Sequence, residues 1–232
     1  MHCYNKRVSI AENYNKLNAR IKQAAEAAGR DPGTIEIVAV SKTVPVERIA
    51  RALDCGIKII GENRVQEAKQ KYAVLGAKAE WHMVGHLQTN KVRDALTIFS
   101  LIHSLDSLHL AEEIENRAER TVDCLIEVNT SGEATKYGIE PGELISFFES
   151  IQRLTKINVR GLMTIGPGWA LEDAENSRSC FRMLFELRGA LAKKYHREFP
   201  CLSMGMTSDF EVAIEEGSTM IRVGTALFGP RK

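Results

Sequence analysis

The chain has 232 residues, a length that suits one barrel-sized domain better than two ordinary domains. Its formal net charge is +1, with basic and acidic residues mixed along the sequence, so neither nucleic acid nor an anionic membrane is expected as a partner. The five cysteines are widely spaced without a C-x-x-C pair, which argues against a disulfide framework or a zinc site and favours reduced thiols in the cytoplasm.

The N-terminal region lacks the apolar core of a signal peptide, and no stretch of the chain is apolar over the length that spans a bilayer. Residues 8–28 predict an amphipathic helix, because apolar side chains recur from Val8 to Ala24 with charged residues between them. Gly29 and the Asp31-Pro32-Gly33 turn end this helix, which precedes the first expected strand.

From residue 35 onward, short β-branched runs alternate with longer helical stretches. The expected strands are Ile35–Val40, Ile57–Ile60, Glu80–Val84, Ile98–His103, Val122–Val128, Val159–Met163, Cys201–Ser203 and Met220–Val223. The expected helices are Val46–Cys55, Val65–Leu75, Thr89–Leu96, Ser107–Arg120, Pro141–Leu154, Leu171–Tyr195 and Asp209–Glu216. Ser107 and Asp209 stand at N-cap positions, and Gly56 and Gly217 stand just after helix ends.

This alternation predicts an α/β fold in which residues 1–232 form a single (β/α)8 TIM barrel with an extra N-terminal helix. A doubly wound open sheet is the alternative, because a strand count taken from sequence is uncertain. No G-x-G-x-x-G follows the first strand, which weakens a dinucleotide-binding interpretation. No linker rich in Gly, Pro or Ser divides the chain.

Lys42 stands at the end of the first expected strand, directly after the run Ile-Val-Ala-Val-Ser. Functional groups of a barrel gather at the C-terminal ends of its strands. By position alone, the simpler interpretation is a rim lysine whose stem lies along apolar surface. The other interpretation is an amine nucleophile, which requires desolvation or nearby positive charge because the ordinary lysine pKa is about 10.4.

Polar residues also follow the second and third expected strands. Asn63 lies in the loop after the second strand, and His86 lies in the loop after the third. Both can line a polar pocket above the barrel. It is equally consistent with the sequence that Asn63 caps a helix and that His86 is a hydrogen-bonded rim residue.

The loops after the last two expected strands are rich in small and hydroxyl residues. The first runs from Ser203 to Asp209, and the second runs from Arg222 to Ala226. Backbone N–H groups in such loops are available to a phosphate, and barrels often bind phosphate after strands seven and eight. One loop alone would be an ordinary turn, but both together with Lys42 predict a phosphorylated ligand. Pyridoxal 5′-phosphate (PLP) and a sugar-phosphate substrate both fit this pattern.

Several blocks of the sequence, taken together and in order, resemble the pyridoxal phosphate homeostasis protein family. That family is a single-domain relative of the barrel domain of alanine racemase. The resemblance extends over nearly the whole chain, as far as Phe228-Gly229. The matching blocks are Val38–Thr43, Gly61–Glu67, Trp81–Lys91, Val128–Glu133, Gly161–Thr164, Leu202–Met206 and Gly217–Thr225.

The resemblance implies which residues bind the cofactor. PLP is expected as a Schiff base on Lys42, and the arginine that faces the pyridine nitrogen in alanine racemase corresponds to Arg222 in the pattern Arg-x-Gly. A charged arginine disfavours protonation of that nitrogen, so PLP there is a weaker electron sink. The full expected set is Lys42, Asn63, His86, Ser203, Met204, Gly205, Met206, Arg222, Gly224 and Thr225.

The same resemblance implies a function with little or no catalysis. Alanine racemase-like enzymes take a second acid/base from an added domain, and the sequence ends at Lys232, so we expect that domain to be absent. The expected function is intracellular PLP homeostasis as a carrier or buffer. The alternative function is a weak PLP-dependent amino-acid racemase. A Schiff-base aldolase that acts on a sugar phosphate is a poorer alternative. We expect no catalytic residue and no metal, a monomer, and apo PLP-dependent enzymes as acceptors. Lys136, after the fifth strand, is expected on the same barrel face as Lys42.

Overall fold

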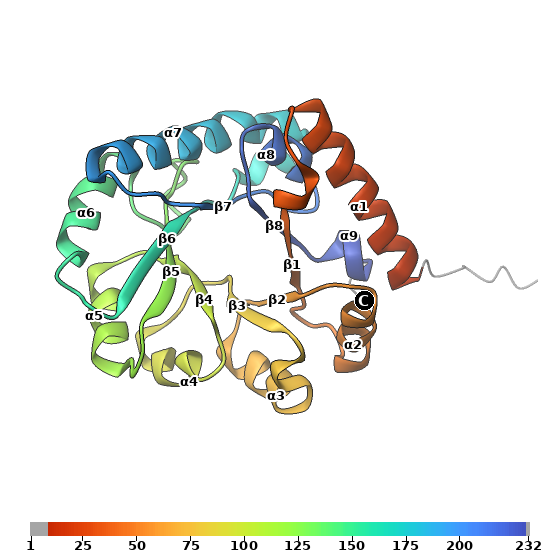
Figure 1. The fold of residues 1–232 in the computed structure, drawn as a ribbon, viewed down its shortest axis with the longest axis horizontal. Coiled ribbons are helices and arrows are strands. Elements are labelled where there is room, and N and C mark those ends of the chain that lie inside the picture. Colours follow the sequence, from red (N-terminus) through yellow and green to blue (C-terminus); the bar gives the residue numbers. More distant parts are fainter. Residues whose placement is uncertain (1–8, 231–232) are drawn as a thin grey trace, which may run out of the picture.

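The computed structural model describes residues 9–230, and its parallel strands close into a barrel in chain order (Figure 1). β8 pairs with β1, with Val38 opposite Arg222, so the sheet is closed and the open-sheet alternative is excluded. The predicted (β/α)8 barrel is therefore confirmed. The strands are β1 (Glu36–Val40), β2 (Ile59–Glu62), β3 (Glu80–Met83), β4 (Leu101–Leu105), β5 (Val122–Glu127), β6 (Ile157–Met163), β7 (Cys201–Ser203) and β8 (Met220–Val223).

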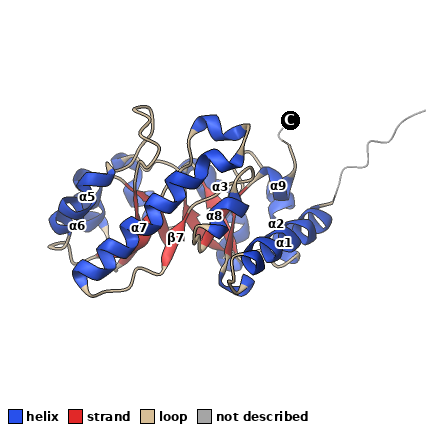
Figure 2. Ribbon diagram, turned by 90° about the horizontal axis from the view of Figure 1, so that it is seen from above, coloured by secondary structure: helices blue, strands red, loops and turns tan. Residues whose placement is uncertain are grey.

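Helices surround the strands, as a second direction of view also shows (Figure 2). No helix among residues 9–230 is both long and apolar enough to cross a membrane. The helices are α1 (Ile10–Ala27), α2 (Val46–Asp54), α3 (Val65–Leu75), α4 (Val92–Leu96), α5 (Leu108–Arg117), α6 (Leu144–Ile151), α7 (Arg178–Tyr195), α8 (Phe210–Glu215) and α9 (Thr225–Phe228).

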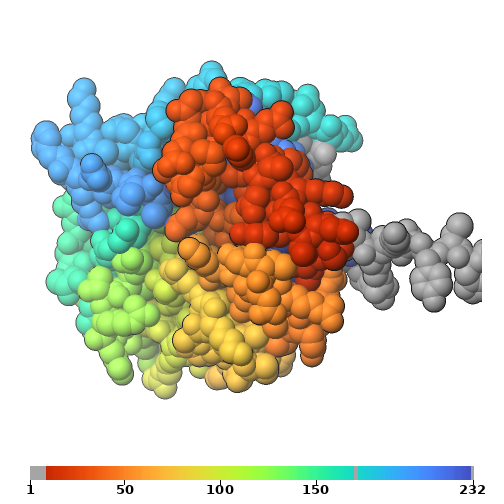
Figure 3. Space-filling view, turned by 45° about the vertical axis from the view of Figure 1, so that its right-hand side comes forward, coloured from red at the N-terminus to blue at the C-terminus, as the bar shows by residue number. Residues whose placement is uncertain are grey.

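The N-terminal helix α1 covers the barrel beside β8. Leu17 of α1 packs in an apolar cluster with Phe210 of α8 and Val223 of β8, all fully or almost fully buried. Ser9 is the N-cap of the helix. In Figure 3, α1 is coloured red and lies across the face of the molecule that is turned to the viewer. Val8, the first residue of the expected helix, lies outside the described residues.

Several element boundaries differ from those expected, and local hydrogen bonds explain the differences. β4 begins at Leu101 rather than Ile98, because the N–H groups of Ile98 and Phe99 donate to the carbonyl of Ala95 and extend the turn of α4. The expected helices at 89–96, 141–154 and 171–195 begin as separate 3-10 turns. The four-residue α9 was not predicted, because it is too short to show a helical period.

Side chains alternate between the barrel interior and the helix layer, as the period of a strand requires. The interior contains an apolar cluster that includes Val84, Leu101 and Met220. On the same side of the sheet, the buried His103 and Arg222 lie two residues after Leu101 and Met220, and the buried His82 of β3 lies two residues before Val84, which follows that strand. The barrel interior thus holds buried polar side chains next to apolar ones.

Candidate functional site

Lys42 lies two residues beyond the end of β1, at the C-terminal rim of the barrel, and is half-buried. Ser41 before it is fully buried, and Thr43 after it has a backbone φ of 64°, in the left-handed region. The chain therefore turns sharply at Lys42. A buried Ser41 and a turn at Thr43 fix the backbone of Lys42 at the rim.

Asn63 and His86 follow β2 and β3 at the same rim. The side-chain Oδ1 of Asn63 is buried and accepts no hydrogen bond from any other residue of 9–230. His86 Nδ1 lies 2.9 Å from Asp106 Oδ2, and its ring stacks on Tyr137 with 4.0 Å between ring centroids. Asn63 thus offers an acceptor to a ligand, whereas His86 forms part of the rim with Asp106 and Tyr137.

The loops after β7 and β8 lie side by side. The N–H of Ala226 in the second loop donates to Thr207 Oγ1 in the first, at 3.3 Å. Gly205 has a φ of 91°, and a Cβ there would lie only 2.5 Å from Ala213 Cβ. A Cβ on Gly224 would lie 3.1 Å from the carbonyl oxygen of Val40, at the end of β1. Gly205 therefore needs to be glycine, and the tight approach at Gly224 shows that the loop after β8 lies next to the strand that leads to Lys42.

The residues predicted to bind phosphate in the first loop differ in what they expose. The hydroxyl of Ser203 is buried against Arg222 and His103, and Met204 packs in the apolar core. The N–H of Met206 donates to Asp209 Oδ1 at 2.7 Å, so the Asp209 side chain turns back to this loop rather than capping α8. Thr225, in the second loop, is exposed at the rim.

Arg222 is a buried cation inside the barrel, with only 5% of its surface exposed. Its Nη1 donates to the carbonyl and the hydroxyl of Ser203, at 2.8 and 2.7 Å, and its Nη2 donates to the carbonyl of Thr164 at 2.8 Å. Burial lowers the pKa of Arg222 to about 10, while Glu127 and Asp209 act in the opposite direction. The guanidinium therefore stays charged at neutral pH.

A chain of hydrogen bonds continues from Arg222 across the barrel. Ser203 Oγ lies 2.9 Å from His103 Nδ1, and His103 Nε2 lies 3.0 Å from His82 Nδ1. His82 Nε2 in turn lies 3.2 Å from Glu80 Oε1, at the N-terminal end of β3. Burial, together with His82 and Arg222, holds the pKa of His103 well below its usual range, so this ring is neutral. The sequence analysis did not identify this chain.

Glu127 is a second functional candidate that the sequence analysis missed. It ends β5, and only 4% of its surface is exposed. Burial, and then the nearby Asp106 carboxylate, raise the pKa of Glu127 to about 7, although Arg222 and Lys136 act against this. Lys136 itself donates to the carbonyl of Gly166 at 3.0 Å. An acidic residue directly after the apolar run Cys124-Leu-Ile, at the end of a strand, was the signal available in the sequence.

These groups fit PLP. A rim lysine can form a Schiff base, Arg222 can donate to a ring nitrogen, and the unpartnered Oδ1 of Asn63 can accept from a ligand hydroxyl. The loops after β7 and β8, which the sequence predicts as the phosphate site, lie side by side, next to the strand that leads to Lys42. No group of His, Cys, Asp and Glu side chains within residues 9–230 is arranged to hold a metal ion.

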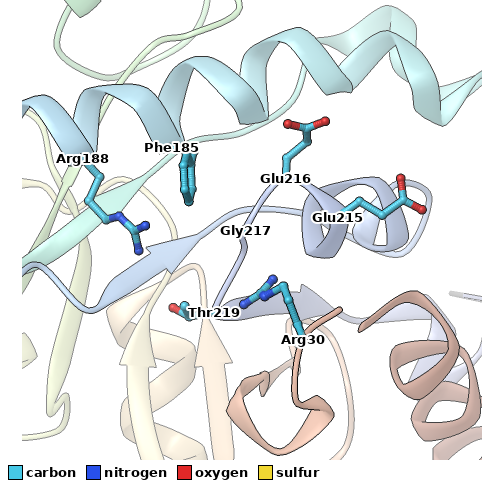
Figure 4. Close-up of a pocket in the computed structure, with 7 residues that line it drawn as sticks. All are labelled: Arg30, Phe185, Arg188, Glu215, Glu216, Gly217 and Thr219. Atoms are coloured by element: carbon cyan, nitrogen blue, oxygen red, sulfur yellow. The ribbon is translucent and has the colours of Figure 1, made fainter. Parts of the chain in front are cut away.

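A separate cavity of about 350 Å³ lies at the opposite end of the barrel, where Arg30 precedes β1 and Thr219 precedes β8 (Figure 4). Phe185 and Arg188 of α7 border it from the helix layer. None of the predicted cofactor-binding residues lines this cavity. The candidate site is therefore the C-terminal rim and not this hollow.

Residues 12–232 match the family model described as the N-terminal domain of alanine racemase. A pyridoxal phosphate homeostasis protein from Aquifex aeolicus is 48% identical over 229 residues, which cover 97% of this chain and 100% of that protein. The protein of the same name from Escherichia coli is 37% identical over 229 residues, which cover 96% of this chain and 97% of that protein.

Solved structures agree with these sequence matches. PipY of Synechococcus elongatus with PLP bound superposes with a TM-score of 0.82 at 33% identity, covering 95% of this chain and 100% of that one. Alanine racemase from Corynebacterium glutamicum, at 20% identity and a TM-score of 0.72, shares the fold over 96% of this chain and 61% of its own length. The chain therefore belongs to the pyridoxal phosphate homeostasis protein family, within the proteins that contain the alanine racemase N-terminal domain.

Proposed function

We propose that this protein binds PLP as a Schiff base on Lys42 and acts in intracellular PLP homeostasis as a carrier or buffer. The observation that supports this most directly is the position of Lys42 at the C-terminal end of β1, next to the loop that contains Gly224. The relatives named for PLP homeostasis, and PipY with PLP bound, favour this cofactor over a sugar phosphate.

The residues around Lys42 would divide the binding of the cofactor among them. The loops that contain Gly205 and Gly224 would supply backbone N–H groups to the phosphate, and the exposed Thr225 would add a hydroxyl. Arg222 donates to the ring nitrogen with the N–H groups that it does not use inside the barrel. Asn63 accepts a hydrogen bond from the ligand through Oδ1.

Arg222 also bears on catalysis. Bound PLP supplies an aldehyde that reacts with amines and an electron sink for carbanions. Because Arg222 has a pKa of about 10, it is a charged donor at neutral pH and keeps the ring nitrogen unprotonated. This weakens the electron sink and favours a carrier over an efficient enzyme. The match to the alanine racemase domain supports one second candidate, a weak amino-acid racemase.

Absorption and borohydride trapping test the covalent site. The purified protein with PLP should absorb in the visible, and borohydride should fix a phosphopyridoxyl group on the peptide that contains Lys42. Lys42→Ala should lose both signals, whereas Lys58→Ala, which alters an exposed lysine before β2, should keep them. An unchanged visible band in Lys42→Ala would refute the assignment.

Isotope exchange and cofactor transfer separate the carrier from the racemase. Incubation of the loaded protein with single L-amino acids in deuterated water, followed by NMR, measures exchange at the α-carbon. Exchange near an ordinary enzyme turnover of about 10 s⁻¹ would favour the racemase. Recovery of activity by an apo PLP-dependent enzyme, without such exchange, is expected for a cytoplasmic, monomeric carrier.

A further inference from the structure

Lys71 of α3 is a buried lysine close to the rim lysine. Only 7% of its side chain is exposed. An ammonium group has three protons to donate, and Lys71 Nζ has three acceptors: the Ser41 carbonyl at 2.6 Å, Glu62 Oε1 at 2.6 Å and Glu67 Oε1 at 2.7 Å. Its donor capacity is therefore filled by these contacts, and it has none left for a ligand.

The acceptors of Lys71 hold the backbone on both sides of Lys42. Before Lys42, the Ser41 carbonyl accepts from Lys71 and the Ser41 hydroxyl donates to Glu62 Oε1. After Lys42, the N–H of Thr43 donates to Glu67 Oε1 at 2.6 Å. One cluster of charged side chains thus binds the residue before the rim lysine and the residue after it.

The backbone of Thr43 is strained by these hydrogen bonds. Its φ of 64° lies in the left-handed region, which a β-branched residue rarely occupies. Such a conformation persists only where the surroundings determine it, and strained residues of this kind gather at functional sites. Two contacts hold this turn: the N–H of Val44 donates to the carbonyl of Ser41 at 2.8 Å, and the N–H of Thr43 donates to Glu67.

We propose that Lys71, Glu62 and Glu67 are positioning residues that direct the amine of Lys42 toward its aldehyde partner. The inference rests on the proposed function, because it requires Lys42 to be the lysine that reacts. A lysine side chain has many rotamers, so the directions available to its amine depend on a fixed backbone at its origin. When the amine is already in position before the reaction, less rotational freedom is lost as it attacks the aldehyde carbon, and the attack is faster.

Glu67 gives the cleanest variant. Its side chain is a quarter exposed, so Glu67→Ala should fold, and it removes the acceptor of the Thr43 N–H. We expect trapping of PLP on Lys42 by borohydride to slow on the order of tenfold. Glu67→Gln keeps an acceptor oxygen and should retain most of the wild-type rate. The matched control is Lys69→Met, on the same helix as Glu67, which removes an exposed ion pair with Asp94 of α4 and should trap at the wild-type rate.

Pyridoxamine 5′-phosphate distinguishes positioning from damage to the pocket, because it has no aldehyde and forms no Schiff base. Its affinity should be the same in wild type and Glu67→Ala. Amide exchange in the protein without cofactor should be faster at Thr43 in that variant. Wild-type trapping in Glu67→Ala, unchanged exchange at Thr43, or a parallel loss of pyridoxamine 5′-phosphate affinity would each overturn the inference. Wild-type protein that traps PLP on another lysine would instead overturn the proposed function, and this inference with it.

Discussion

Two buried cations flank the candidate site, and they are held in different ways. Lys71, on the β1–β2 side, contacts two carboxylates and one carbonyl. Arg222, on the β7–β8 side, contacts two carbonyls and one hydroxyl, and no carboxylate oxygen lies within hydrogen-bond distance of it among residues 9–230. Both are almost completely buried, so the difference lies in their partners and not in their access to water.

The difference separates a supporting residue from a binding residue. All three protons of Lys71 are used, and its charge is compensated by Glu62 and Glu67. Arg222 uses three of its five N–H groups, and its charge is compensated only at longer range by Glu127 and Asp209. A closed, paired cation stabilises the fold, whereas a cation with spare donors is available to a ligand.

The largest effect is expected when the paired cation is removed. Lys71→Met leaves two carboxylates, one of them fully buried, without their cation. Breaking a buried ion pair on one side costs about 3–5 kcal/mol of the free energy of unfolding. Urea unfolding of the protein without cofactor measures this cost, and Lys69→Met should leave the unfolding midpoint in place. A Lys71→Met midpoint equal to that of wild type would remove the distinction between the two cations.

Glu67, beside Lys71, and Glu127, on the side of Arg222, should respond to pH in opposite ways, whereas burial raises the pKa of Glu62, the other partner of Lys71. Burial raises the pKa of Glu67, but the hydrogen bonds that it accepts from Lys71 and Thr43 outweigh this effect. The net pKa of Glu67 is below the usual range. Burial, and then the nearby Asp106 carboxylate, raise the pKa of Glu127 to about 7, and Arg222 opposes this only without a direct contact. Between about pH 4.5 and 7, folded Glu127 binds a proton that the unfolded chain has released.

Stability should therefore fall as the pH rises through this window, by up to about 3 kcal/mol from Glu127 alone. Glu127→Gln, which is neutral at every pH, should remove this decrease and should be more stable than wild type above pH 7. Urea unfolding of both proteins without cofactor, from pH 4.5 to 8, measures the difference. Parallel stability profiles for the two proteins would show that Glu127 titrates normally.

The sequence predicted the barrel and the rim residues because both depend on local patterns. Strand and helix periods alternate clearly, and Lys42 and Arg222 lie in recognisable blocks of sequence. The loops after β7 and β8 were predicted as segments that bind phosphate, but the roles of single residues within them were not resolved. The hydroxyl of Ser203 points to Arg222 and His103, which depends on strands that are distant in sequence.

The residues that the sequence did not reveal act through such distant contacts. Lys71 follows Gln70 on a helix rich in charged residues, so its sequence neighbourhood resembles that of a solvated lysine. Its burial appears only when Glu62 of β2 and the turn at Ser41 meet it in the folded chain. His82 and His103 likewise come together only because β3 and β4 pair.

The smallest expected effect concerns the direction of the hydrogen bonds that support Arg222. A guanidinium has no acceptor, so Ser203 Oγ accepts from Arg222; an ionised carboxylate has no donor, so His82 Nε2–H donates to Glu80. A neutral imidazole has a single N–H, and with one N–H on each ring a single arrangement satisfies both ends. Ser203 donates to His103 Nδ1, and His103 Nε2–H donates to His82 Nδ1.

Two-bond ¹⁵N–¹H correlation spectra above pH 8 test this arrangement directly, because protonated and bare ring nitrogens differ strongly in shift. Both rings should show a proton on Nε2 and a bare Nδ1, and Glu36→Gln, an exposed change at the start of β1, should leave them unaltered. A proton on His103 Nδ1 would mean that Ser203 accepts twice and that its own proton needs another acceptor in a dry interior. In the predicted direction, Ser203 gives its one proton to His103 and keeps its lone pairs for Arg222. Neutral groups then hold Arg222 without carboxylate contact, and its charge remains available to the ligand.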